Sequence, residues 1–75
     1  MIVQLKLMGM LKDQSPPGDQ IEINDQATIS DLLASLSIDA NTVHVFTVNG
    51  KLERDKGRSL ANGDELAVFP PVGGG

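Results

Sequence analysis

The feature that most constrains the fold is a single helical stripe in a chain otherwise patterned as strands. Thr28 is followed three residues later by Asp31, a spacing typical of a helix start, because the hydroxyl accepts from a first-turn amide and the acid favours the positive helix end. Apolar residues then recur at helical spacing, at Ile29, Leu32, Leu33 and Leu36. This stripe must pack on a sheet.

The strands of such a sheet are indicated by alternation of apolar and polar residues. Residues 1–7 alternate with the period of a half-buried strand. A second short strand is predicted around Ile21 and Ile23, and a last one over residues 65–69. In the last strand the side chains divide into two faces, with Leu66 and Val68 on one and Ala67 and Phe69 on the other.

Residues 43–48 are rich in β-branched and aromatic side chains and predict a further strand. Apolar residues lie on both of its faces, so we expect it to be covered on both sides and leave its inner face unassigned. Asn49-Gly50 supplies the positive backbone angles of a hairpin turn that leads into a short return strand. Gly9 and residues 13–19 are interpreted as a loop of turn-forming residues.

The resulting order is strand, strand, helix, strand, short strand, strand. This order predicts an α+β roll of the β-grasp (ubiquitin-like) type, a mixed sheet of four to five strands with one main helix packed across it. We expect a β-grasp domain over residues 1–71 and a flexible C-terminal glycine tail over residues 72–75.

Size and composition exclude several classes of function. A chain of 75 residues buries only roughly 60% of its unfolded surface, which leaves little room for an elaborate active site. With no cysteine there is no disulfide, thiolate zinc site or cysteine nucleophile. The net charge of -4 argues against nucleic acid as a partner. No apolar run approaches the roughly 18 residues of a membrane span, and no signal peptide is seen, so we expect a cytoplasmic protein.

Residues that could carry out catalysis are few and scattered. His44 is the only histidine, and without cysteine or a neighbouring acidic pair it forms no recognisable triad or metal site. The acidic residues lack the spacing of a calcium loop. We therefore predict no catalytic residue, no metal and no cofactor bound by this chain itself.

The sharpest feature is the C-terminal segment Phe69-Pro70-Pro71-Val72-Gly73-Gly74-Gly75. Proline fixes its own backbone angle and biases the preceding residue towards extended geometry, so the segment should project in a defined direction. Five residues from Pro71 to Gly75 reach about 17 Å when extended. Glycine passes a narrow channel because it has no Cβ. The terminal carboxylate is ionised at neutral pH and becomes an electrophile only after activation, for example by ATP.

We assign roles along this segment accordingly. Gly75 carries the reactive terminus, and Gly73 and Gly74 thread it into a partner. Residues that dock on the partner are Phe69, Pro70, Pro71 and Val72. Upstream, Met8, Met10 and Leu11 either form an adaptable docking surface with Phe69 or pack in the core.

The stretch that leads into this segment carries a family resemblance. Gly63-Asp64-Glu65-Leu66-Ala67-Val68-Phe69-Pro70-Pro71-Val72 before terminal glycines resembles the ubiquitin-like sulfur carriers. These include the small subunit of molybdopterin synthase, which the tail resembles more, and the thiamine-biosynthesis sulfur carrier. Weaker matches are residues 2–7, residues 28–36 and Val48-Asn49-Gly50.

The resemblance implies a non-enzymatic sulfur carrier. An E1-like adenylating enzyme that uses ATP and magnesium would form an acyl-adenylate at Gly75, and a persulfide donor enzyme would supply the sulfur of a thiocarboxylate. The large subunit of molybdopterin synthase would then accept that sulfur. The alternatives are a sulfur carrier for thiamine thiazole synthesis, a ubiquitin-like modifier that forms isopeptide bonds, and an interaction module that does not use its tail.

Overall fold

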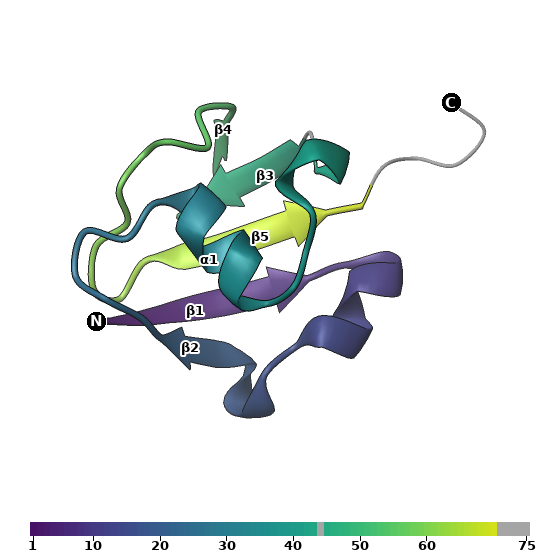
Figure 1. Cartoon of the computed structure of the whole chain (residues 1–75), viewed down its shortest axis with the longest axis horizontal. Helices are drawn as coiled ribbons and strands as arrows, with labels where there is room; N and C mark the ends of the chain where they lie inside the picture. Colours follow the sequence, from purple (N-terminus) through teal and green to yellow (C-terminus); the bar gives the residue numbers. More distant parts are fainter. Residues whose placement is uncertain (44, 71–75) are drawn as a thin grey trace.

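A five-stranded mixed sheet with α1 across one face forms the frame of the molecule (Figure 1). The computed structural model describes residues 1–43 and 45–70. The elements in chain order are β1 (Ile2–Leu7), η1 (Gly9–Gln14), η2 (Pro17–Asp19), β2 (Gln20–Glu22), α1 (Ile29–Ser35), η3 (Ala40–Thr42), β3 (Val45–Val48), β4 (Lys51–Glu53) and β5 (Glu65–Phe69), where η denotes a 3-10 helix.

The last strand of the described chain lies at the centre of the sheet. The strand order is β2-β1-β5-β3-β4. β5 runs parallel to β1, with Val68 opposite Leu7, and antiparallel to β3, with Phe69 opposite Val45. This mixed sheet confirms the predicted β-grasp fold. Hydrogen bonding on both sides holds β5 in a fixed register, and therefore fixes where Phe69 lies.

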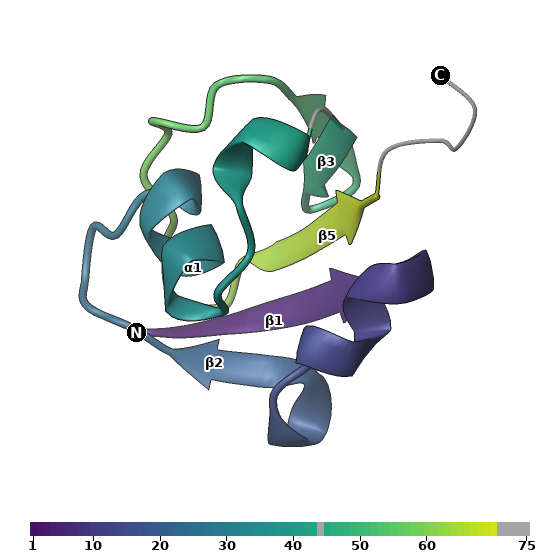
Figure 2. The same cartoon turned by 45° about the vertical axis from the view of Figure 1, so that its right-hand side comes forward.

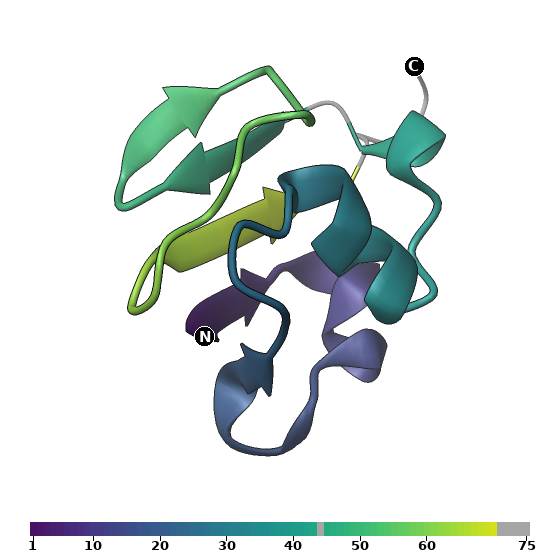
Figure 3. The ribbon, with the colours of Figure 1, turned by 60° about the vertical axis from the view of Figure 1, so that its left-hand side comes forward.

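α1 begins where the sequence predicts. The Asp31 amide donates to the Thr28 hydroxyl oxygen at 3.1 Å, and the Thr28 amide donates to the Asp31 carboxylate at 3.0 Å. This reciprocal pair satisfies two amides that the first helical turn leaves without partners. Leu36 caps the other end and packs partly against the core. Figure 3 shows α1 on one side of the sheet, and its inward residues Ile29, Leu32 and Leu33 are fully buried.

The core lies between α1 and the side of the sheet that faces it. The burial of side chains in this core shows which face of β3 points inward. Phe46 and Val48 are buried, whereas Val45 is 46% exposed. The expectation that this strand is covered on both sides is therefore wrong. Successive side chains of a strand alternate between faces, so Val45 points to the face opposite α1.

The segment after β1 also differs from the prediction. Residues 9–14 and 17–19 form the 3-10 helices η1 and η2 instead of a plain loop. Leu11 is only 9% exposed and belongs to the core cluster, so it anchors η1. Met8 and Met10 are 37% and 73% exposed. Of the three residues considered for docking or core packing, Leu11 packs in the core and the two methionines remain accessible.

The turn between β3 and β4 has the conformation expected from its sequence. Asn49 and Gly50 adopt φ values of 54° and 83°, the left-handed geometry that two-residue hairpins need. The turn lies beside the beginning of β5, because Val48 pairs with Leu66. The hairpin therefore supports the end of β5 that is farthest from the C-terminal tail.

Candidate functional site: the end of the last strand

The candidate site begins where β5 ends. Leu66 and Val68 are fully buried beneath α1, which confirms the predicted division of this strand into two faces. Phe69 lies on the opposite face and is partly buried, beside the exposed Val45 of β3. The phenyl group is thus outward-facing, as predicted, but only partly accessible.

Other apolar side chains surround this strand end. Met8 follows β1, and its amide donates to the Val68 carbonyl at 3.1 Å, so it lies next to Phe69 across the parallel pair. Met10 belongs to η1, which packs against both β1 and β5. We refer to Met8, Met10, Val45 and Phe69 as the apolar rim. Figure 2 shows the arrowheads of β1 and β5 ending on the same side, with η1 adjacent to them.

Pro70 is the last residue that the structure describes, and it is half-buried. A methyl group added at Gly9 would lie 3.0 Å from Cγ of Pro70 and 3.7 Å from its Cδ. The proline ring therefore sits close to the backbone of η1. The remaining predicted site residues lie outside the described residues, and their roles stay predictions: Pro71, Val72, Gly73, Gly74 and Gly75.

The beginning of β5 is polar, in contrast to the apolar side chains at its end. The Asp64 carboxylate accepts from the Ala61 amide at 2.8 Å and from the Asn49 side-chain amide at 2.9 Å. The bond from Ala61, and then that from Asn49, hold the pKa of Asp64 below its ordinary value, despite the opposing effect of burial. A carboxylate that is stabilised as an acceptor in this way stays ionised and braces the turn.

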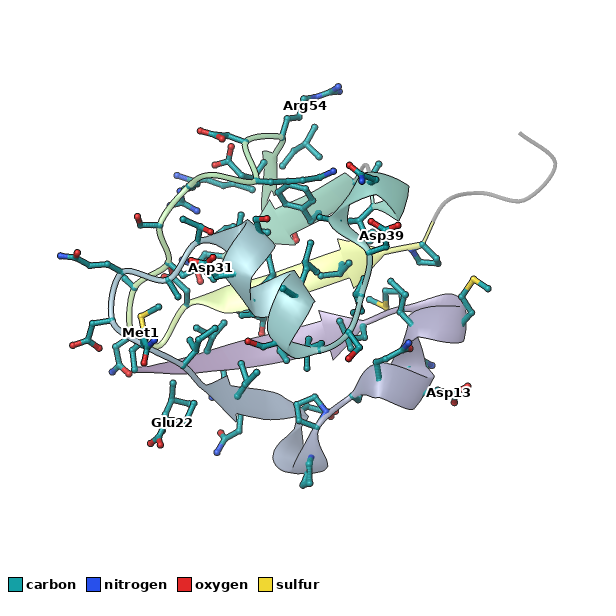
Figure 4. All side chains as sticks on the ribbon, viewed as in Figure 1. Met1, Asp13, Glu22, Asp31, Asp39 and Arg54 are labelled. Carbon is teal, nitrogen blue, oxygen red and sulfur yellow. The ribbon has the colours of Figure 1, made fainter. Side chains whose placement is uncertain are left out.

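Carboxylates in the described part of the chain do not gather into a reactive or metal-binding cluster. Figure 4 shows the labelled Asp13, Glu22, Asp31 and Asp39 on separate parts of the fold. No group of three or more potential metal ligands occurs within residues 1–43 and 45–70. His44 lies outside the described residues. What these residues offer is an exposed apolar surface beside a strand that leads towards the carboxyl terminus.

Two features of the site were not found from the sequence. Val45 was not predicted to be exposed beside Phe69, because strand 43–48 is apolar on both faces and its phase is set by pairing with β5. The sequence predicts Gly9 only as part of a loop, and its approach to Pro70 joins two positions that are distant in sequence. A glycine two residues after the end of a strand was the only available signal. Separately from the site, none of the helices in residues 1–43 and 45–70 has the length and apolar character that a membrane span requires.

The strand order, the single main helix and the central position of β5 define a ubiquitin-like β-grasp protein. Comparison with family models identifies the family within this class. The chain belongs to the ThiS family, whose model matches residues 5–75. This confirms the resemblance to ubiquitin-like sulfur carriers. No protein with a curated description is significantly similar in sequence.

Solved structures support the same fold. SAMP1 from Haloferax volcanii is 26% identical, with all of both chains covered and a TM-score of 0.71. A candidate subunit 1 of the molybdopterin converting factor from Pyrococcus furiosus is 23% identical over 96% of this chain and 99% of that chain, with a TM-score of 0.71. A complex of subunits 1 and 2 of the molybdopterin-converting factor from Helicobacter pylori contains a chain that is 21% identical, with full coverage of both chains and a TM-score of 0.61.

Proposed function

We propose that this chain is a non-catalytic sulfur carrier whose Gly75 carboxylate is converted to a thiocarboxylate. The observation that carries the proposal is the ThiS family match, which extends through the last residue. A fixed central strand that leads to this terminus beside an accessible apolar rim is consistent with delivery of the terminus into a partner.

The chemistry proceeds in steps that a partner catalyses. An E1-like adenylating enzyme binds ATP with magnesium, and the Gly75 carboxylate attacks the α-phosphate and expels pyrophosphate. A terminal persulfide sulfur of a donor enzyme then attacks the acyl carbon, and AMP leaves. A thiol cleaves the resulting acyl disulfide, which leaves the thiocarboxylate on Gly75 and a disulfide with the donor. The carrier supplies only the carboxylate and the surface that docks it.

The acceptor that we propose is the large subunit of molybdopterin synthase. Phe69-Pro70-Pro71-Val72 is the segment that resembles the molybdopterin branch, and a structural neighbour is found in a complex of subunits 1 and 2 of its molybdopterin-converting factor. The branch is tested by supplying the thiocarboxylate form to a molybdopterin synthase large subunit with its pterin precursor, and in parallel to a thiazole synthase with its substrates. Sulfur transfer only in the thiazole reaction would assign the chain to the thiamine alternative.

A second candidate function is protein modification. The similarity to SAMP1, a small archaeal modifier protein, extends over the whole chain. A modifier forms an isopeptide bond between Gly75 and a lysine of another protein, whereas a carrier accumulates as a free thiocarboxylate. Intact-mass measurement of the protein isolated from cells separates the two, because replacing one carboxylate oxygen with sulfur raises the mass of the free chain.

The terminal-carboxylate mechanism is tested by ATP-pyrophosphate exchange with the activating enzyme. Deleting Gly75, or adding one glycine after it, should abolish exchange while leaving the fold intact. The matched control inserts one glycine after Gly18, in an exposed turn. This control has the same composition as the extended variant but keeps the tail length, and we expect normal exchange. Normal exchange by the extended variant would refute the mechanism.

A further inference from the structure

The backbone immediately after β1 meets the backbone immediately after β5. In a parallel pair, Met8 is placed to bond to β5 residues on both sides of Phe69. Its amide donates to Val68 at 3.1 Å, but residue 70 is a proline and has no N–H to donate to the Met8 carbonyl. That carbonyl accepts from the Leu11 amide instead, at 3.1 Å. The ladder between β1 and β5 therefore stops before Pro70.

Beyond this ladder, the Pro70 ring packs close to the backbone of Gly9. Gly9 has a φ of +57°, and a Cβ at this position would approach Cγ of Pro70 to 3.0 Å. A contact of 3.0 Å is tighter than nine in ten real Cβ contacts, so the Pro70 ring would have to shift by a few tenths of an ångström. The buried Leu11 ties η1 to the core, so Gly9 cannot readily move away. Glycine fits both the backbone angle and the space without any shift of the neighbouring atoms.

We propose that Gly9 is a positioning residue for the C-terminal tail. Because Gly9 has no side chain, the Pro70 ring can pack directly against its backbone. This contact fixes the point from which the chain continues towards Gly75. The inference rests on the proposed function, because it concerns how the Gly75 carboxylate reaches the ATP of an activating enzyme. A displaced Pro70 moves the starting point of the tail while the apolar rim still docks.

The test is the kinetics of adenylation with the chain as the varied substrate. For Gly9→Ala we expect kcat to fall about 3- to 10-fold, because a shift of a few tenths of an ångström is smaller than the misplacement of about 1 Å that costs about 100-fold. KM and the affinity measured by calorimetry should stay near the wild-type values, because the docking side chains are unchanged. The matched control is Gly50→Ala, which has a similar left-handed φ of +83° but nothing within 4 Å of the added methyl. It should retain the wild-type kcat.

A second variant separates displacement of Pro70 from a direct clash between the new methyl and the partner. Pro70→Ala removes the Cγ and Cδ atoms that the methyl would meet. Adding Gly9→Ala to the Pro70→Ala variant should therefore lower kcat little further. The combined effect would then be smaller than the sum of the two single effects, which indicates that the two positions are coupled. A full additional loss in the double variant would overturn the proposal, since the methyl would then act without Pro70.

A readout without any enzyme completes the test. Nuclear Overhauser contacts between Gly9 and the Pro70 ring should be present in the wild type and altered in Gly9→Ala. Altered contacts with an unchanged kcat would refute the positioning role while leaving the carrier function standing. Failure of the wild-type chain to be adenylated would refute the proposed function itself, and these two outcomes are distinguishable.

Discussion

The two ends of β5 differ in how they are held. At its beginning, Asn49 receives a hydrogen bond from the Glu65 amide at 2.9 Å and donates to Asp64 at 2.9 Å. The Gly63 amide donates to the Ile2 carbonyl at 2.7 Å, and the Ile2 amide donates to the Asn62 side chain at 2.7 Å. At its other end, Pro70 has no N–H, and the neighbouring side chains are the apolar rim.

Under the proposed function, this difference assigns stability to one end of the strand and partner recognition to the other. Hydrogen bonds between turns join the start of β5 to β1 and to the β3–β4 hairpin, so this end fixes the register of the sheet. The end at Phe69 keeps apolar side chains accessible to solvent. Burying them would favour stability, so their exposure indicates an interaction surface. Substitutions at the two ends should therefore affect different measurements.

The largest expected effect on stability is at Asn49. Asn49→Ala removes both side-chain hydrogen bonds, one of them to a carboxylate, and places alanine at a φ of 54°. We expect the free energy of unfolding to fall by about 2 to 3 kcal/mol, measured by denaturant unfolding. Asn49→Gly keeps the freedom to adopt this φ and should lose most of the same stability. A glycine variant as stable as the wild type would show that the backbone angle alone matters.

The matching substitution at the other end should affect binding instead. Phe69→Ala removes a partly buried aromatic group from the apolar rim, and we expect affinity for the activating enzyme to fall by about 1 to 2 kcal/mol. Isothermal titration calorimetry measures this change. Leu52→Ala is the control, because Leu52 is 58% exposed but lies on the edge strand β4, and it should leave affinity unchanged. Equal losses for both variants would argue against a rim-specific docking surface.

The comparison also shows which parts of the molecule the sequence could predict. The helix start at Thr28 and Asp31 and the hairpin at Asn49-Gly50 depend on residues close in the chain, and both were predicted. The bounds of β5 were predicted because Asn62-Gly63 precedes it and Pro70 follows it. Local chemistry decides these features, so local sequence reveals them.

Features that depend on distant partners were missed. The phase of β3 follows from pairing Phe46 with Val68, which its own apolar residues do not encode. η1 exists because Leu11 reaches the core, although its sequence resembles a loop. At the candidate site, the face on which Phe69 lies was predicted from the alternation of its strand, and the roles of the tail residues stay predictions. The approach of Gly9 to Pro70 required the parallel pairing of β1 with β5.

A smaller effect should appear in the pH dependence of stability. The pKa of Asp64 is lowered in the folded state, mainly by the bond from the Ala61 amide. The unfolded chain therefore binds this proton more readily, and the stabilisation is present above the unfolded pKa of about 3.9 and is lost as pH falls through the lower folded pKa. Unfolding of the wild type and of Asp64→Asn should be compared across this acidic range. The wild type should lose more stability on acidification, and parallel curves would contradict the assignment.

The smallest effect is expected on the outer face, where Lys6 of β1 pairs with Glu65, the first residue of β5, at 3.9 Å. Their side chains are 60% and 46% exposed, so water and salt screen the attraction while ordering two side chains opposes it. We expect Lys6→Gln to change the free energy of unfolding by less than about 0.5 kcal/mol. Glu65→Gln and the double variant complete a cycle that gives the coupling energy of the pair. A coupling that persists at high salt would mean that this ion pair, in addition to the hydrogen bonds of Asn49, stabilises the beginning of β5.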